Sequence, residues 1–344
     1  MPKADVRKQR QRALSLWCAA LSGLLSCFPS GEGARAQGYD RPGDTRSARS
    51  MVIARRGMVC TSQPLASEAG LRILRRGGNA FDAAVAAAAV LNVVEPMSTG
   101  IGGDMFALAW SAREKKLVGL NGSGRSAKTA TVERYRELGF ERVPTYGPHA
   151  VTVPGAFHGW VTLIEKHGSL PLEVILEDAI TYAEEGFPVS EVISSYWKGA
   201  LAHRERPGFA PTYLVRDGTE WRTPRMGEVF RQPDLAKTFR ALASGGVEEF
   251  YRGEIARRIA SFLEEQGSLL RFEDLAAHES TWVEPISTEF RGYVLHELPP
   301  NGQGIVALEI LNILAGYPLE SLGHNSAEYI HLFAEAKKLA FADR

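Results

Sequence analysis

Residues 95–125, EPMSTGIGGDMFALAWSAREKKLVGLNGSGR, contain two glycine-rich segments with an apolar stretch and a charged turn between them. The first segment holds Gly100, Gly102 and Gly103, and the second ends on Arg125. Glycines at this density mark backbone that takes a positive φ or closely approaches another group. Two interpretations stay open at this point: tight connections at the end of a hairpin, or a polar floor from which Arg125 binds an anion.

The stretch between the glycine segments predicts a β-hairpin. Residues 105–110 and 117–120 are the two strands, and the charged residues 113–116 form the turn. Residues 105–110 are apolar at every position, so we expect this strand to be covered on both faces rather than to form an edge that faces water. The hairpin brings both glycine segments to the same end, where they are predicted to be neighbours.

Two helices are predicted before this hairpin. Residues 64–76 carry an apolar stripe that ends at two glycines, and Asn79 is placed to cap a helix over 81–94, with Asp82 in its first turn. The second helix is almost entirely alanine and valine and lacks a polar face, which is typical of an interior helix. The two helices are expected to pair antiparallel on a sheet.

The chain after the hairpin predicts mainly helices. The proline-, glycine- and charge-rich residues 203–228 are expected to form a surface excursion, and residues 248–266 a single helix. Residues 288–298 alternate like one strand, and Asn325 is predicted to cap the last helix. The histidines show no metal-ligand spacing, so each is expected to be a hydrogen-bonded surface or core side chain rather than part of a metal site.

The first 36 residues have the order of a secretory signal peptide: a basic segment, the apolar run 13–28 and the small-residue site Ala34-Arg35-Ala36. Cleavage is predicted before Gln37, which implies a secreted or periplasmic protein. A lipoprotein acylated at Cys27 is the alternative. The apolar run is too short for a stable membrane span, and residues 37–51 are predicted to be a flexible arm.

Charge and cysteine usage exclude several classes. Removing residues 1–36 takes six basic and two acidic residues from the 40 of each sign, which leaves 34 basic and 38 acidic residues and a net charge of −4. This balance disfavours nucleic acid as a partner. Cys60 remains as the sole cysteine, so an internal disulfide and a metal site built on paired cysteines are both excluded.

Five stretches together resemble the gamma-glutamyltransferase (gamma-glutamyltranspeptidase) family. They occur in family order at residues 77–106, 120–125, 149–160, 290–304 and 331–344. The resemblance implies an α/β fold of the N-terminal nucleophile hydrolase type, a four-layer αββα sandwich that is incomplete in this chain. It also implies a precursor that cleaves itself into two subunits, in which the new N-terminal threonine of the small subunit attacks a γ-glutamyl amide. No cofactor is expected.

One functional residue of the family matches a position in this chain. Arg125 corresponds to the arginine that binds the α-carboxylate of the γ-glutamyl substrate, a role suited to a bidentate guanidinium. Classical members read like Asp-Gly-Arg-Glu here, whereas this chain has LNGSGR at 120–125, which is similar to acylase-type relatives. The nucleophile is expected beyond residue 344, so no catalytic residue is assigned, and residues 52–344 are predicted to be a large-subunit part truncated at its C-terminus.

The sequence therefore predicts the large-subunit portion of an exported γ-glutamyl hydrolase/transferase that acts on amides such as glutathione through an acyl-enzyme. Its predicted partner is the small subunit of the same precursor, without which we expect no turnover. Three alternatives stay open: a cephalosporin-acylase-like amide hydrolase of the same family, a non-catalytic truncated fragment, and a secreted binding module that uses the glycine segments for a ligand.

Overall fold

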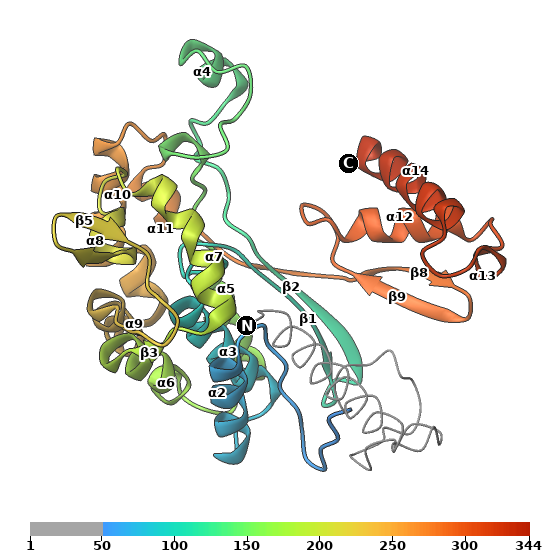
Figure 1. Ribbon diagram of the computed structural model, residues 1–344, viewed down its shortest axis with the longest axis horizontal. Coiled ribbons are helices and arrows are strands. Elements are labelled where there is room, and N and C mark those ends of the chain that lie inside the picture. The colour runs from blue at the N-terminus through green and yellow to red at the C-terminus, as the bar shows by residue number, and fades with distance from the viewer. Residues whose placement is uncertain (1–50) are drawn as a thin grey trace, which may run out of the picture. The chain divides into compact units, whose positions relative to one another are not determined.

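A computed structural model describes residues 51–344 of the chain (Figure 1). The predicted signal peptide, its cleavage site before Gln37 and the predicted arm up to residue 50 lie outside the described residues. The chain divides after Arg55, and residues 51–55 contain neither helix nor strand. All the helices and strands below belong to the unit Arg56–Arg344.

This unit combines helices of 4 to 19 residues with strands of 2 to 7 residues. The helices are α2 (Pro64–Arg75), α3 (Ala80–Val94), α4 (Val132–Glu137), α5 (Ala156–His167), α6 (Leu172–Glu185), α7 (Glu191–Trp197), α8 (Phe209–Tyr213), α9 (Pro233–Tyr251), α10 (Glu254–Glu265), α11 (Phe272–Ala276), α12 (Gly304–Leu314), α13 (Leu319–Leu322) and α14 (Ala327–Asp343). The strands are β1 (Met105–Ser111), β2 (Lys116–Gly122), β3 (Phe187–Pro188), β4 (Val215–Asp217), β5 (Glu220–Arg222), β6 (Val229–Phe230), β7 (Thr281–Val283), β8 (Ile286–Phe290) and β9 (Tyr293–Glu297). Two 3-10 turns lie at Pro148–Ala150 and Lys198–His203.

Helix α3 is the interior helix that its composition predicts, and it packs against α2, α5 and α6. Its predicted start is confirmed, because Asn79 and Asp82 form a reciprocal capping box. Asp82 is fully buried and also accepts hydrogen bonds from the backbone N–H and the hydroxyl of Ser169, at 3.0 and 2.6 Å. One carboxylate therefore caps α3 and holds the loop that joins α5 to α6.

The predicted hairpin is confirmed as β1 and β2, which pair antiparallel from Met105↔Gly122 to Ser111↔Lys116. Strand β7 pairs with the other edge of β2, so the order is β1-β2-β7. The helix packed closely on this hairpin is α5, rather than the predicted pair α2 and α3. Gly159 of α5 allows the close approach, because a Cβ built on it would lie 2.9 Å from the Met105 sulfur.

The prediction that β1 is covered on both faces is wrong for the part of the chain that the structure describes. Met105, Ala107 and Ala109 face α5, but Phe106, Leu108 and Trp110 are 44, 41 and 62% exposed. Among the described strands β1 pairs only with β2, so it is an edge strand. An apolar run on both faces predicts that both faces meet apolar groups, but it cannot say where the covering groups come from.

Three other boundaries differ from the prediction. Residues 288–298 are not one strand but the hairpin β8–β9, because Arg291 and Gly292 both take positive φ, as a two-residue turn requires. The helix predicted over 248–266 is broken at Arg252 and Gly253, between α9 and α10. Helix α14 is capped by the Ser326 hydroxyl, which accepts from the Tyr329 N–H at 3.1 Å, rather than by Asn325.

The last elements share a small apolar core of their own. Helices α12 and α14 pack against each other, and α12 also packs on β8 (Figure 1). The buried side chains of this core are Val306, Ile310, Leu314, Ala336 and Ala340. In Arg56–Arg344, none of the helices is both long enough and apolar enough to cross a bilayer.

Candidate functional site

Arg125 lies just after β2, at the end of a turn that begins with Asn121. The Asn121 side-chain oxygen accepts hydrogen bonds from the Ser123 N–H at 2.9 Å and from the Ser123 hydroxyl at 2.8 Å. An asparagine that bonds the backbone two residues ahead is a common way to fix a turn. These two hydrogen bonds therefore fix the backbone at the end of β2, and Arg125 follows directly after it.

The second glycine segment of the sequence is packed against the first, as predicted. The Gly124 N–H donates to Asp104 Oδ1 at 3.0 Å, and the Gly103 carbonyl accepts from the Gly155 N–H at 3.0 Å. A Cβ built on Gly124 would lie only 1.4 Å from the Val153 carbonyl oxygen. Position 124 therefore has no room for a side chain, because the Gly124 backbone lies directly against the Val153 carbonyl.

The Arg125 side chain is exposed and borders a cavity of about 740 Å³. Within residues 51–344 no carboxylate or carbonyl pairs with its guanidinium. The cavity also holds one further cation, Lys128, and one carboxylate, Glu279. The two cations outnumber the one carboxylate, so the charge of the cavity suits an anionic group, and the guanidinium has free donors to bind it.

Asn301 closes another side of this cavity, and the sequence did not predict its role. It comes from the proline- and glycine-rich break between β9 and α12. Its Oδ1 accepts from Asn121 Nδ2 at 2.9 Å, and its Nδ2 donates to the Ser123 hydroxyl at 3.1 Å. The one sequence signal that points to Asn301 is its position in a glycine- and proline-rich break before a helix, a signal that does not name its contacts.

A buried aromatic cluster lies near the Arg125 segment. The His278 ring stacks on Tyr251 with centroids 5.2 Å apart and meets the His158 ring edge-on at 5.2 Å. His158 Nδ1 lies 3.0 Å from the Ser280 hydroxyl. The prediction that every histidine is hydrogen-bonded is wrong for His278, which is 3% exposed and has no partner for either ring nitrogen within residues 51–344.

The neutral form of His278 is strongly favoured in this place. Burial lowers the pKa of His278 to about 4, and the positive charges of His158 and Arg125 act in the same direction. Burial also lowers the pKa of His158. At neutral pH the cluster therefore adds no positive charge next to Arg125. Among the described residues no group of three or more potential metal ligands occurs.

The sequence matches the family model of gamma-glutamyltranspeptidase over residues 66–344. It is 40% identical over 294 residues to the glutathione hydrolase-like YwrD proenzyme of Bacillus subtilis (strain 168). That match covers 85% of this chain and 55% of the relative. The chain thus spans about half the length of the curated relatives it matches.

Two solved structures share the fold. The crystal structure of cephalosporin acylase from Bacillus halodurans is 45% identical with a TM-score of 0.78, over 89% of this chain and 57% of that one. The crystal structure of Helicobacter pylori gamma-glutamyltranspeptidase is 30% identical with a TM-score of 0.78, over 86 and 85%. These likenesses, together with the mixed helices and sheets, confirm the predicted N-terminal nucleophile hydrolase fold. The chain therefore belongs to the gamma-glutamyltranspeptidase family of enzymes.

Proposed function

We propose that this chain is the large-subunit portion of an exported amide hydrolase/transferase, and that Arg125 binds the α-carboxylate of a γ-glutamyl donor such as glutathione. The observation that carries the proposal is the guanidinium of Arg125, which has no partner within residues 51–344 and lies at the edge of a polar cavity. Its backbone is held by contacts to Asp104 and Val153. A guanidinium held on rigid backbone can meet a carboxylate with two parallel hydrogen bonds. The threonine nucleophile comes from the remaining part of the precursor.

The same proposal supplies a partner for the exposed face of β1. Phe106, Leu108 and Trp110 form one continuous apolar row on this face, and an apolar edge strand is a template for pairing with another chain. The relatives carry the name proenzyme, which supports a precursor processed to a heterodimer. We propose that the small subunit of the same precursor covers this row.

A second candidate is a cephalosporin-acylase-like amide hydrolase. It is favoured by the LNGSGR sequence at 120–125 and by the 45% identity to the Bacillus halodurans cephalosporin acylase. The two candidates differ in what the acyl group carries next to Arg125. A γ-glutamyl group has an α-carboxylate and an α-amine, whereas a dicarboxylic acyl group has the carboxylate alone.

Four p-nitroanilides of matched length separate these functions: γ-glutamyl, glutaryl, 4-aminobutyryl and butyryl. The γ-glutamyl group carries a carboxylate and an amine, the glutaryl group the carboxylate alone, the 4-aminobutyryl group the amine alone, and the butyryl group neither. The enzyme is assembled from this chain and the remaining part of its precursor, and kcat/KM is measured for each substrate. A preference for γ-glutamyl over glutaryl supports the first candidate, and the reverse preference supports the acylase. No turnover of any of the four, or of an acyl-cephalosporin, supports the non-catalytic fragment.

Replacing Arg125 tests its role within the same substrate set. Losing a charge-assisted bidentate contact costs about 2–3 kcal/mol, or roughly 30- to 150-fold in kcat/KM. Arg125→Lys and Arg125→Ala are expected to lower the values for the two substrates with a carboxylate and to spare the other two. Arg113→Ala, at the opposite end of the hairpin, is the matched control. Equal losses on all four substrates in the Arg125 variants would exclude carboxylate binding by this residue.

A further inference from the structure

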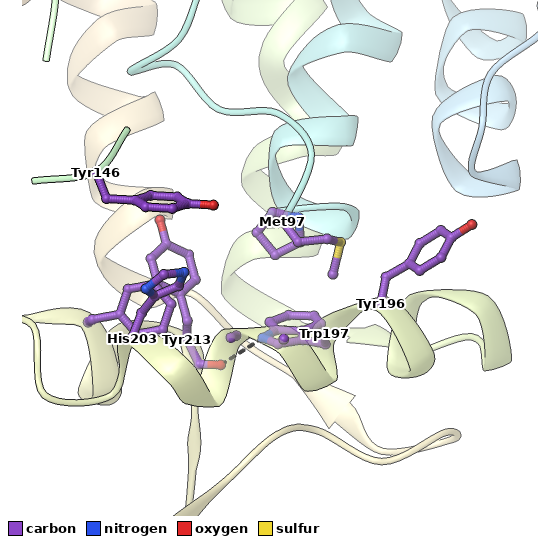
Figure 2. A pocket seen from close by; sticks show the side chains of 10 residues that line it. Met97, Tyr146, Tyr196, Trp197, His203 and Tyr213 are labelled. Carbon is purple, nitrogen blue, oxygen red and sulfur yellow. Dashed lines mark hydrogen bonds between the residues drawn. The ribbon is translucent and has the colours of Figure 1, made fainter. Parts of the chain in front are cut away.

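A second cavity, of about 580 Å³, is built largely from aromatic side chains (Figure 2). Its walls include Met97, Tyr146, Tyr196, Trp197, His203 and Tyr213. It shares no lining residue with the Arg125 cavity, so it is a separate site. Its volume lies in the range of about 300–1,000 Å³ that small-molecule sites occupy.

The floor of this cavity is fixed by packing. Trp197 is 1% exposed, its indole N–H donates to the Tyr213 carbonyl at 2.9 Å, and its ring meets Phe230 edge-on at 4.8 Å. Figure 2 shows this hydrogen bond beneath the open space, with Met97 above Trp197. The floor therefore belongs to the main core, and part of the predicted surface excursion 203–228 forms a wall of the cavity.

The rim of the cavity includes two tyrosines that lie outside the buried core, Tyr146 and Tyr196. Tyr146 and Tyr196 are each 65% exposed, and Figure 2 shows them on opposite sides of the space. Their hydroxyls, like that of Tyr213, have no hydrogen-bond partner within residues 51–344. Large amphipathic side chains left exposed around a hollow are typical of a binding site rather than of core packing.

At one end of the cavity lies His203, which is in contact with the cationic side chain of Arg206. Arg206 Nε donates to His203 Nδ1 at 3.1 Å, so the proton of the neutral imidazole lies on Nε2, which is then a donor. The Arg206 guanidinium lies 5.6 Å from the Tyr146 ring centroid. The lining residues include no carboxylate. This polarity suits an anionic group at the His203 end and opposes a cationic ligand.

We propose that this cavity binds an aromatic carboxylate, with the ring against Tyr196 above the Trp197 floor and the carboxylate at His203 and Arg206. Aromatic walls favour a planar ring through offset and edge-to-face contacts. The donor at His203 and the charge of Arg206 orient the acid group. The site does not depend on the function proposed for Arg125.

Phenylacetate is a suitable probe, because it has one ring and one carboxylate. Its binding to the full chain is measured by calorimetry, alongside cyclohexylacetate, acetate and phenethylamine. Cyclohexylacetate keeps the carboxylate but has no aromatic ring, and acetate has the carboxylate alone. Phenethylamine keeps the aromatic ring but carries a cation. We expect phenylacetate to bind more tightly than all three. Absence of phenylacetate binding, or equal binding of phenethylamine, would overturn the proposal.

Substitutions at exposed positions locate the bound probe without disturbing the core. Tyr196→Ala and Arg206→Gln are expected to weaken phenylacetate binding by roughly 3- to 10-fold each, the loss of one aromatic or charge contact. Tyr293→Ala removes an 80% exposed tyrosine on β9 and is the matched control, with no expected change. If both cavity variants bind phenylacetate as tightly as the control, the probe binds elsewhere and the assignment is wrong.

Discussion

Gly124→Ala tests whether close backbone packing positions Arg125. A Cβ at position 124 would lie 1.4 Å from the Val153 carbonyl oxygen and 2.5 Å from its carbon. Ordinary contact begins at 3.4 Å, so the two chain segments must separate by about 2 Å. Gly124 does not take a positive φ, so the cost comes from this contact and not from backbone strain.

The magnitude follows from what such a separation breaks. The Val153 N–H donates to the Arg125 carbonyl at 2.9 Å, and the Gly124 N–H donates to Asp104 at 3.0 Å. Losing two hydrogen bonds at about 1 kcal/mol each, together with an overpacking cost of about 1–3 kcal/mol, gives a loss of about 3–5 kcal/mol. This is a large share of the roughly 5–15 kcal/mol that stabilises a folded domain.

The assay is equilibrium urea unfolding of the full chain, followed by far-UV circular dichroism. Gly102→Ala is the matched control, because a Cβ there meets nothing within 4 Å and the φ is not positive. We expect the unfolding free energy of this control to equal that of the natural chain or to exceed it by up to about 0.5–1 kcal/mol. If Gly124→Ala unfolds at the same urea concentration as the natural chain, the close approach does not exist. If Gly102→Ala is equally damaging, the loss reflects general intolerance of both glycine segments.

Three further predictions concern stability and association. Asp82→Ala leaves Ser169 and the α3 cap without their acceptor, so we expect it to lower the unfolding free energy in urea by about 3 kcal/mol. Asp234→Ala, at an exposed helix start, is the control and is expected to lower it by less than about 1 kcal/mol. The pKa of His278 is about 4 when folded and about 6.5 when unfolded, so the unfolded state binds more protons between these values. The unfolding free energy therefore falls by at most about 3 kcal/mol as the pH drops from 6.5 to 4, and His278→Phe should flatten this dependence without loss at pH 7. If the slope stays unchanged in that variant, His278 is not its source. Trp110→Ser, on the exposed face of β1, should change the unfolding free energy by less than about 0.5 kcal/mol. It should weaken association with the remaining part of the precursor, which ultracentrifugation measures. Unchanged association would exclude this face as the contact.

Features with a local cause were predictable from the sequence. The capping box of Asn79 and Asp82 depends on residues within one helical turn. The β1–β2 hairpin follows from two apolar runs around a charged turn. Local patterns failed where two structures share one pattern. Alternation over 288–298 fits a hairpin as well as a strand, and the Arg291-Gly292 turn decides between them.

The sequence by itself determined the family, the interior character of α3 and the place of Arg125 after a glycine-rich turn. The tertiary structure decided which residues surround Arg125, since Asn301 is 180 positions from the Asn121 it bonds. It also decided that His278 is buried with no hydrogen-bond partner among residues 51–344, and that an open aromatic cavity forms above Trp197. The physical reason is that helix caps and turns depend on near neighbours in the chain. A cavity or a buried polar group depends on packing between distant segments, which periodicity does not encode.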